Sequence, residues 1–261
     1  MEVIGTMQRI AAACFVVGVT VLMFSEPAPA QDGETWYRVN VVQVRPDKLD
    51  DFIELYQEEI NPALQRAGVP WRSAWETGEF GDTYQRTFVE PMVSFAELDL
   101  GGPLARSLDR RQRERVLAKL REYTDSRESF AVLYRADLSI ESEDVSGLPI
   151  ARLTSLHIAP GRSAEWEAFL RENRDSFRAA GVVFGIYQRQ FGPGPVVWQI
   201  VENLRSYAQL ERGGILRAFG DDATDQVVRG LSGVITSVER TVLAYDLALS
   251  YRVGQNLTGE E

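Results

Sequence analysis

Cysteine and histidine are almost absent from this sequence. Cys14 is the one cysteine and His157 the one histidine. Zinc sites built from His and Cys are therefore excluded, and no spacing of Asp and Glu suggests a calcium loop, so we expect no metal site. The G-x-G-x-x-G, Walker A and G-x-S-x-G patterns are also missing, which disfavours nucleotide-dependent enzymes and serine hydrolases.

The first thirty residues predict a signal peptide. Ile10–Phe24 is an apolar run without a charge, Arg9 precedes it, and Ala28-Pro29-Ala30 has the pattern of a cleavage site. The run is short for a membrane span, although an uncleaved anchor is the alternative. Cleavage would leave a mature chain without cysteine, hence without disulfides, thiol nucleophiles or iron–sulfur clusters. We expect export to the periplasm or the extracellular space.

Positive charge is also in short supply. The chain has 28 Lys and Arg against 38 Asp and Glu, a net charge of −10. The predicted signal peptide carries Glu2, Arg9 and Glu26, a net of −1, so the mature chain carries −9. An acidic protein repels phosphate backbones and anionic lipids, so we expect no nucleic-acid partner and no membrane contact after cleavage.

One strand-into-helix stretch occurs twice, 114 positions apart, as Arg38–Phe52 and Arg152–Trp166. Each copy opens on an Arg, has a Pro after the strand, and places an aromatic residue one turn into a helix. Gly101-Gly102 and Gly213-Gly214 repeat at nearly the same offset. Matching offsets over a hundred residues predict a duplication.

Each copy predicts the order β-α-β-β-α-β, the split pattern of ferredoxin-like folds. In the first copy the hydrophobic periodicity predicts strands at 36–44, 71–77, 83–90 and 130–138, with a long helix before the last. The predicted fold class is α+β. We expect the following organisation: a signal peptide (1–30), repeat 1 (36–139), an acidic linker (140–149), repeat 2 (150–250) and a flexible tail (251–261).

The Pro-Asp/Gly-Lys/Arg-x-x-x-Phe/Trp pattern and the Phe-Gly hairpin turns at Phe80-Gly81 and Phe191-Gly192 resemble the dimeric α+β barrel superfamily. The resemblance covers 36–139 and 150–250 and is nearest to NIPSNAP-like and antibiotic-biosynthesis-monooxygenase-like domains. It implies that two ferredoxin-like units pair their sheets into a barrel. A tandem copy would build this barrel within one chain as a pseudo-dimer, although a homodimer is the alternative.

His157 is the sharpest catalytic candidate, and we assign no other catalytic residue. It occupies the strand position that Gln43 holds in the first copy, so the copies differ there in chemistry. Facing the barrel interior, His157 could serve as a general base or a haem ligand. The alternative is a hydrogen-bonded histidine with a structural role in the sheet, and we expect no cofactor.

Aromatic and basic side chains alternate on the predicted strands. A cavity walled by them would suit a small aromatic or carboxylated ligand, and the alternative is ordinary core packing. The ligand-binding candidates are Asn40, Gln43, Trp75, Tyr84, Arg86, His157, Tyr187 and Trp198. The monooxygenase resemblance singles out Asn40 and Trp75. Glu90 and Glu202 end the third strand of each copy, where they could meet at a pseudo-twofold axis or cap local backbone groups.

Three functions follow from these patterns. The first is an exported small-molecule-binding or interaction module. The second is a cofactor-independent monooxygenase or isomerase that acts on an aromatic or polyketide-like substrate in the barrel. The third is a haem-associated protein that uses His157. The sequence leaves the choice between an enzyme and a binding protein open.

Overall fold

The computed structural model describes residues 34–141 and 148–254, apart from the side chains of residues 221–223. The predicted signal peptide and most of the predicted linker lie outside these residues. No helix within the described residues is long and apolar enough to cross a membrane.

The first half of the described chain contributes four strands to an antiparallel sheet. They are β1 (Thr35–Val44), β2 (Trp71–Thr77), β3 (Gln85–Met92) and β4 (Thr124–Tyr134). The second half contributes β5 (Ile150–Ile158), β6 (Gly185–Phe191), β7 (Val197–Leu204) and β8 (Ile235–Tyr245). Within the halves the strand orders are β2-β3-β1-β4 and β6-β7-β5-β8.

Two further pairings close the sheet into an eight-stranded barrel. Strand β4 pairs with β6, where Tyr134 lies opposite Tyr187, and β8 pairs with β2, where Tyr245 lies opposite Trp75. Closure removes the four strand edges that the separate sheets would expose. The predicted α+β class and antiparallel barrel are confirmed.

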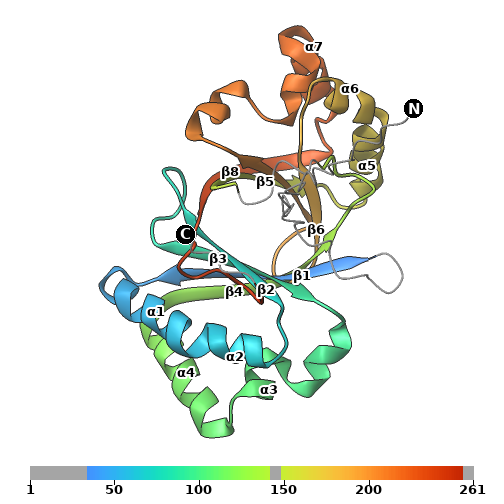
Figure 1. Ribbon diagram of the computed structural model, residues 1–261. Coiled ribbons are helices and arrows are strands. Elements are labelled where there is room, and N and C mark those ends of the chain that lie inside the picture. The colour runs from blue at the N-terminus through green and yellow to red at the C-terminus, as the bar shows by residue number, and fades with distance from the viewer. Residues whose placement is uncertain (1–33, 142–147, 255–261) are drawn as a thin grey trace, which may run out of the picture.

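Helices cover the barrel on two opposite sides (Figure 1). On one side lie α1 (Leu49–Leu55), the π-helical turn η3 (Tyr56–Ile60), α2 (Asn61–Arg66), α3 (Gly102–Ser107) and α4 (Arg110–Tyr123). On the other lie α5 (Ser163–Glu172), α6 (Arg174–Ala179) and α7 (Gly220–Gly230). Short 3-10 turns complete the connections: η2 (Pro46–Lys48), η4 (Phe95–Leu100), η6 (Tyr207–Arg212) and η7 (Ile215–Phe219).

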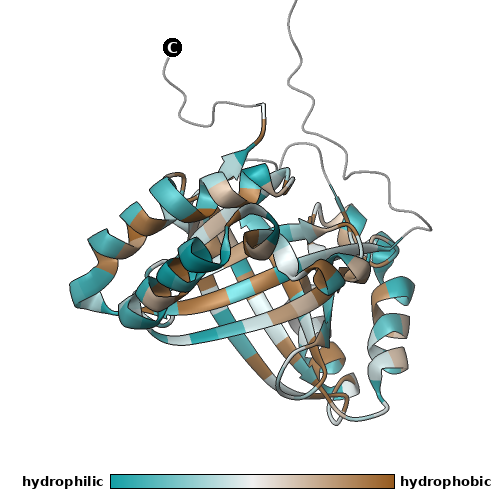
Figure 2. Cartoon of the chain, turned by 90° about the horizontal axis from the view of Figure 1, so that it is seen from below, coloured by the Kyte–Doolittle hydropathy of each residue, from teal (hydrophilic) through white to brown (hydrophobic). Residues whose placement is uncertain are grey.

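The two main hydrophobic cores lie between the sheet and these helices. The first is centred on Phe52 and Phe88, and the second on Trp166 and Trp198. Figure 2 shows the corresponding hydrophobic segments along the strands and the polar outer faces of the helices. The barrel interior holds a smaller cluster around Phe130. Alternate residues of each strand therefore face either helices or the interior.

Two predicted boundaries are corrected. Strand β4 begins at Thr124 instead of residue 130, because its first residues pair with β1 as far as Val44 and so stop the preceding helix at Tyr123. The tail does not begin at residue 251, since Tyr251–Arg252 form a short strand, β9, against β2. The Tyr251 hydroxyl also donates to the carbonyl of Val69, which holds this segment in place.

Candidate functional site

A cavity of about 230 Å³ lies between the helix-facing side of the first four strands and helices α2–α4. We call it the first cavity. The sheet supplies its polar floor and the helices supply most of its apolar wall. It is lined by Arg38, Asn40, Tyr56, Ile60, Leu64, Arg72, Glu90, Gly101, Gly102, Pro103, Leu104, Ala105, Arg113, Leu117, Leu120 and Arg127.

A row of three charged side chains crosses the floor of the first cavity. The β1–β3 register places Arg38 opposite Glu90. The β2–β3 register pairs Ser73 with Val89, so the preceding residue of β2, Arg72, lies on the other side of Glu90. The Arg38 Nη1 donates to Glu90 Oε1 at 3.2 Å, and Glu90 is almost fully buried. One carboxylate therefore lies between two guanidinium groups but makes an ion pair with only Arg38.

Arg72 is the unusual member of this row. It is only 4 % exposed, yet it makes no ion pair within the described residues. Its Nη1 donates to the neutral Oδ1 of Asn61 at 3.3 Å, and its Nε has no hydrogen-bond partner. The guanidinium carbon lies 4.0 Å from the ring centroid of Phe88 and 4.9 Å from that of Tyr56. Stacking on aromatic rings offsets part of the cost of burying this charge, but only part.

The remaining polar groups add to the positive charge. Arg127 donates from Nη2 to Asn40 Oδ1 at 3.1 Å, and α4 contributes Arg113. Four arginines thus face one glutamate around the first cavity, a local formal charge of +3 on a protein of net charge −10. Arginine forks match carboxylate oxygens in geometry, so this floor is suited to an acidic group.

The apolar wall owes its shape to an irregular helix. Between α1 and α2 the backbone widens into the π-helical turn η3, which begins at Tyr56 and ends at Ile60, both of which line the first cavity. Widened turns of this kind recur at functional sites because they re-aim side chains. Leu64, Leu117 and Leu120 complete an apolar surface opposite the arginines.

The second half of the barrel does not repeat this floor. It keeps the ion pair: Arg152 binds both oxygens of Glu202 at 2.8 Å. Strand register, however, puts Thr154 where the first half has Asn40, Phe184 where it has Arg72, and Val238 where it has Arg127. Phe184, which is buried in the second core, therefore takes the position of Arg72, and the row of charges is not repeated.

The structure divides the predicted ligand-binding residues between two faces. Gln43, Trp75, His157 and Tyr187 face the barrel interior, whereas Asn40, Arg86 and Trp198 face the helices. Tyr84 precedes β3 in the hairpin loop, with a φ of 64°. These side chains therefore do not form one site, and Asn40 is the member that lines the first cavity.

Arg86 and Trp198 have structural partners. Arg86 makes ion pairs with Glu76 at 2.9 Å and Asp246 at 3.4 Å. Trp198 is fully buried in the second core, with the Arg135 guanidinium 5.5 Å from its ring centroid. The surroundings of these two residues agree with ordinary core packing, the alternative to a ligand cavity.

His157 and Gln43 lie at equivalent ends of β5 and β1. His157 Nε2 is 3.4 Å from Glu239 Oε1, and Gln43 Nε2 donates to the carbonyl of Thr83 at 2.6 Å. His157 faces the interior and lines neither sheet–helix cavity. A haem bound in either of these cavities could not take His157 as its ligand, and the haem hypothesis stays a prediction. Within the described residues no cluster of three His, Cys, Asp or Glu side chains could hold a metal ion.

Sequence reasoning missed Arg72 and misjudged Glu90. Glu90 and Glu202 do not meet at an axis, because each is held by the arginine opposite it on its own sheet. The signal for Arg72 was present: it shares a strand face with Ala74, which packs in the first core. A charged residue at a core-facing position departs from the usual burial of apolar side chains, and it is rarely buried without an ion-pair partner.

Three tyrosines pack together inside the barrel. The rings of Tyr37, Tyr134 and Tyr187 have centroids 5.1 to 6.5 Å apart, and the Tyr134 hydroxyl donates to Glu141. Burial, with a contribution from the charge of Glu141, raises the pKa of Tyr37 to about 12. Burial also raises the pKa of Tyr134 and Tyr187. These phenols remain protonated at neutral pH.

The shift of Tyr37 predicts a loss of stability at alkaline pH. The unfolded phenol ionises near pH 10, so its contribution is complete below that pH and is lost as pH rises toward 12. The pKa difference corresponds to roughly 2–3 kcal/mol. The two pKa values define a window of about pH 9 to 11.5. Over this window we expect the free energy of unfolding to fall less for Tyr37→Phe than for the wild type, as measured by urea unfolding. Parallel curves for the two proteins would contradict the assignment.

Comparison with known proteins gives a likeness in structure and none in sequence. No family model matches the chain, and no curated protein matches it. An anthrone oxidase-like protein superposes with a TM-score of 0.56 at 13 % identity, over 90 % of this chain and 100 % of the other. A candidate monooxygenase from Lactobacillus acidophilus gives 0.53 at 7 % identity, over 85 % and 98 %.

A third solved structure, of a candidate chlorite dismutase, gives a TM-score of 0.52 at 12 % identity, over 83 % of this chain and 97 % of the other. At identities this low, the likeness shows a similar fold and gives no information about activity. These likenesses confirm the predicted α+β barrel fold, while the superfamily and the NIPSNAP detail stay predictions. The chain has the ferredoxin-like α+β barrel fold of these proteins.

Proposed function

We propose that the protein binds a small molecule with an acidic group and an apolar or aromatic body in the first cavity. The observation that carries the proposal is the buried charge of Arg72, which no carboxylate of the described chain neutralises. Burying an ion without a counter-ion costs roughly several kcal/mol, even after the surrounding protein has relaxed. A bound carboxylate would remove most of that cost.

The shape of the first cavity defines the ligand further. Its volume of about 230 Å³ equals that of roughly eight water molecules at ~30 Å³ each. This suits a one-ring acid better than a polyketide-sized molecule. The acidic group would contact Arg72 and Arg38, while the ring would lie against Tyr56 and the leucines of α4.

The strand register supports an origin by duplication. We infer two tandem β-α-β-β-α-β units, residues 36–139 and 150–250, that pair as a pseudo-dimer. One chain supplies all eight strands, so a monomer is the proposed state. Thr154, Phe184 and Val238 replace Asn40, Arg72 and Arg127 in the second unit, so the proposed binding function belongs to the first unit. Export through the segment 1–30 remains part of the proposal.

Binding of benzoate tests the proposal, with neutral benzamide as the matched ligand. We expect isothermal titration calorimetry to show that benzoate binds at least about tenfold more tightly than benzamide, because hydrogen bonds between charged groups contribute ~1.5–3 kcal/mol. Arg72→Gln should remove this preference. Arg212→Gln, which alters an exposed arginine of the second half, is the control and should keep it.

Two outcomes would contradict the proposed function. Equal binding of benzoate and benzamide would show that no acidic group is recognised. An unchanged benzoate affinity in Arg72→Gln would place any site elsewhere. Circular dichroism of each variant distinguishes a lost contact from a lost fold.

Oxygenase activity is the second candidate. The same cavity could hold a hydroxylated one-ring substrate, and the fold likeness to an anthrone oxidase-like protein suggests oxidation of an aromatic compound. If the activity is present, the full chain should accelerate oxygen uptake by hydroquinone, as an oxygen electrode would record. Asn40→Ala should slow it, because Asn40 lines the cavity beside Arg127. Oxygen uptake at the buffer rate would reject this candidate while leaving the binding proposal intact.

A further inference from the structure

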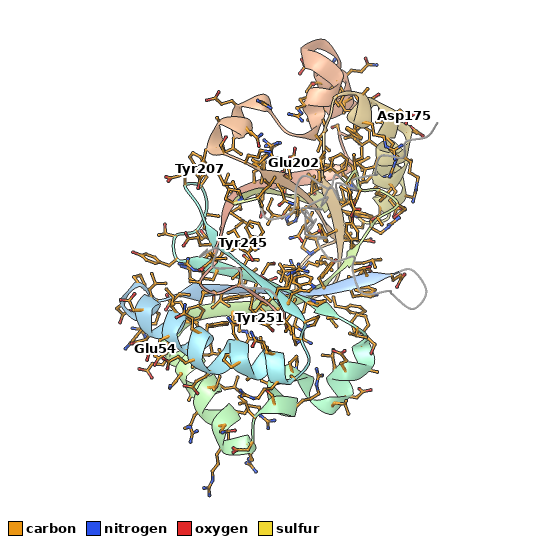
Figure 3. All side chains as sticks on the ribbon, in the orientation of Figure 1. Glu54, Asp175, Glu202, Tyr207, Tyr245 and Tyr251 are labelled. Carbon is orange, nitrogen blue, oxygen red and sulfur yellow. The ribbon has the colours of Figure 1, made fainter. Side chains whose placement is uncertain are left out.

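A second cavity, of about 260 Å³, lies on the opposite helical side of the barrel. It is bordered by β5, β7 and the turns η6 and η7, in the upper part of Figure 3, where Glu202 is labelled. Its charged and amide lining is Arg152, Glu202, Asn203, Arg205, Gln209, Arg212 and Arg217. Arginine is thus the commonest residue around it.

Two arginines that line the second cavity make no ion pair within the described residues. Arg152 binds both oxygens of Glu202 through Nε and Nη2, and Nη2 also donates to the carbonyl of Gly213 at 2.6 Å. That pair is neutral overall. Arg212 and Arg217 line the cavity beside it without an ion pair to a described carboxylate. These two side chains add a formal charge of +2 to the lining.

One donor of the Arg152 guanidinium has no acceptor among the described residues. The hydrogen bonds of Arg152 to the described residues involve Nε and Nη2 but not Nη1. Glu202 fixes the plane of this guanidinium by a bidentate contact, so Nη1 has a set position. Nη1 is not among the fully buried atoms that lack a partner, so water or a ligand can reach it.

The walls of the two cavities differ in a way that separates their ligands. The first cavity has an aromatic and aliphatic side, whereas the second has no aromatic residue among its lining residues and only Leu148, Val183 and Leu204 as larger apolar ones. Gln209 accepts a hydrogen bond from the backbone N–H of Arg205 and so holds the turn beside the arginines. The occupant should therefore be compact, highly charged and hydrated.

We propose that the second cavity binds a phosphate group, either as the free ion or on a small monoester. Phosphate offers oxygens in several directions to Arg152, Arg212 and Arg217 at once, and its charge of about −1.5 to −2 exceeds that of one carboxylate. On a protein of net charge −10, bulk electrostatics repels anions. A concave site that includes Arg212 and Arg217, which make no ion pair within the described residues, is then what allows one to be held.

Calorimetric titration of the full chain with inorganic phosphate tests this, with sodium chloride of equal ionic strength as the blank. We expect saturable binding that Arg212→Gln weakens by about tenfold, the effect of losing one charge-assisted hydrogen bond. Arg212 is exposed and makes no contact on which folding would depend. Arg229→Gln, which alters an exposed arginine of α7 outside both cavities, should leave phosphate affinity unchanged. A phosphate monoester such as glycerol phosphate, titrated in parallel, distinguishes the free ion from a bound group.

Three results would overturn the proposal. The first is an absence of saturable heat with phosphate and with glycerol phosphate. The second is an Arg212→Gln affinity equal to that of the wild type. The third is a loss of phosphate binding in Arg72→Gln but not in Arg212→Gln, which would place the anion in the first cavity. Benzoate binding is measured separately, so either cavity can fail without the other.

Discussion

Hydrogen bonding between two pairs of strand edges is the constraint on which the structure depends. Each half of the chain forms a four-stranded sheet, and such a sheet leaves two edges unpaired. The β4–β6 and β8–β2 pairings satisfy all four edges within one chain. Closure also fixes which residues face inward, because alternation along each strand leaves no freedom once the register is set.

Closure directs the chemistry of the protein away from the barrel interior. Inside, Tyr37, Tyr134 and Tyr187 pack against one another and remain neutral. The cavities of about 230 and 260 Å³ lie instead on the outer faces, where the helices do not cover the sheet completely, and a smaller one of about 100 Å³ lies beside Tyr134 and Tyr187. Both outer faces keep an Arg–Glu pair across two strands, and the neighbours of that pair differ between the halves. The two cavities thus share a frame and offer different chemistry.

Much of the fold could be predicted from the sequence. The repeated strand-helix stretch, the Gly pairs and the alternation of Trp71–Thr77 specify elements that depend on local pattern, and β2 has the predicted bounds. The start of β4 could not be predicted, because residues 124–129 are a polar stretch without the alternation of a strand, and their pairing with β1 is what makes them one. Which face of each strand lines the barrel depends on how two distant sheets meet, and no local pattern encodes that.

The candidate site was less accessible to sequence reasoning for the same reason. Asn40 was identified, but it was grouped with Trp75 and Tyr187, which lie on the other side of the sheet. His157 stood out by its rarity, and rarity says nothing about a neighbouring cavity. Arg72 draws attention only when its burial is known, since an arginine in a strand is ordinary and a 4 % exposed arginine without a carboxylate partner is not.

The central claim is that the charge of Arg72 serves a ligand and not the fold. Urea unfolding of Arg72→Met without added ligand tests it most directly. If the charge is unneutralised in the free protein, replacing it with an apolar side chain of similar length should leave the unfolding free energy unchanged within about 1 kcal/mol or raise it. If Arg72 is instead a structural partner of Glu90, the same substitution should lower that free energy by about 3–5 kcal/mol, as breaking a buried ion pair does. The second result would contradict the account.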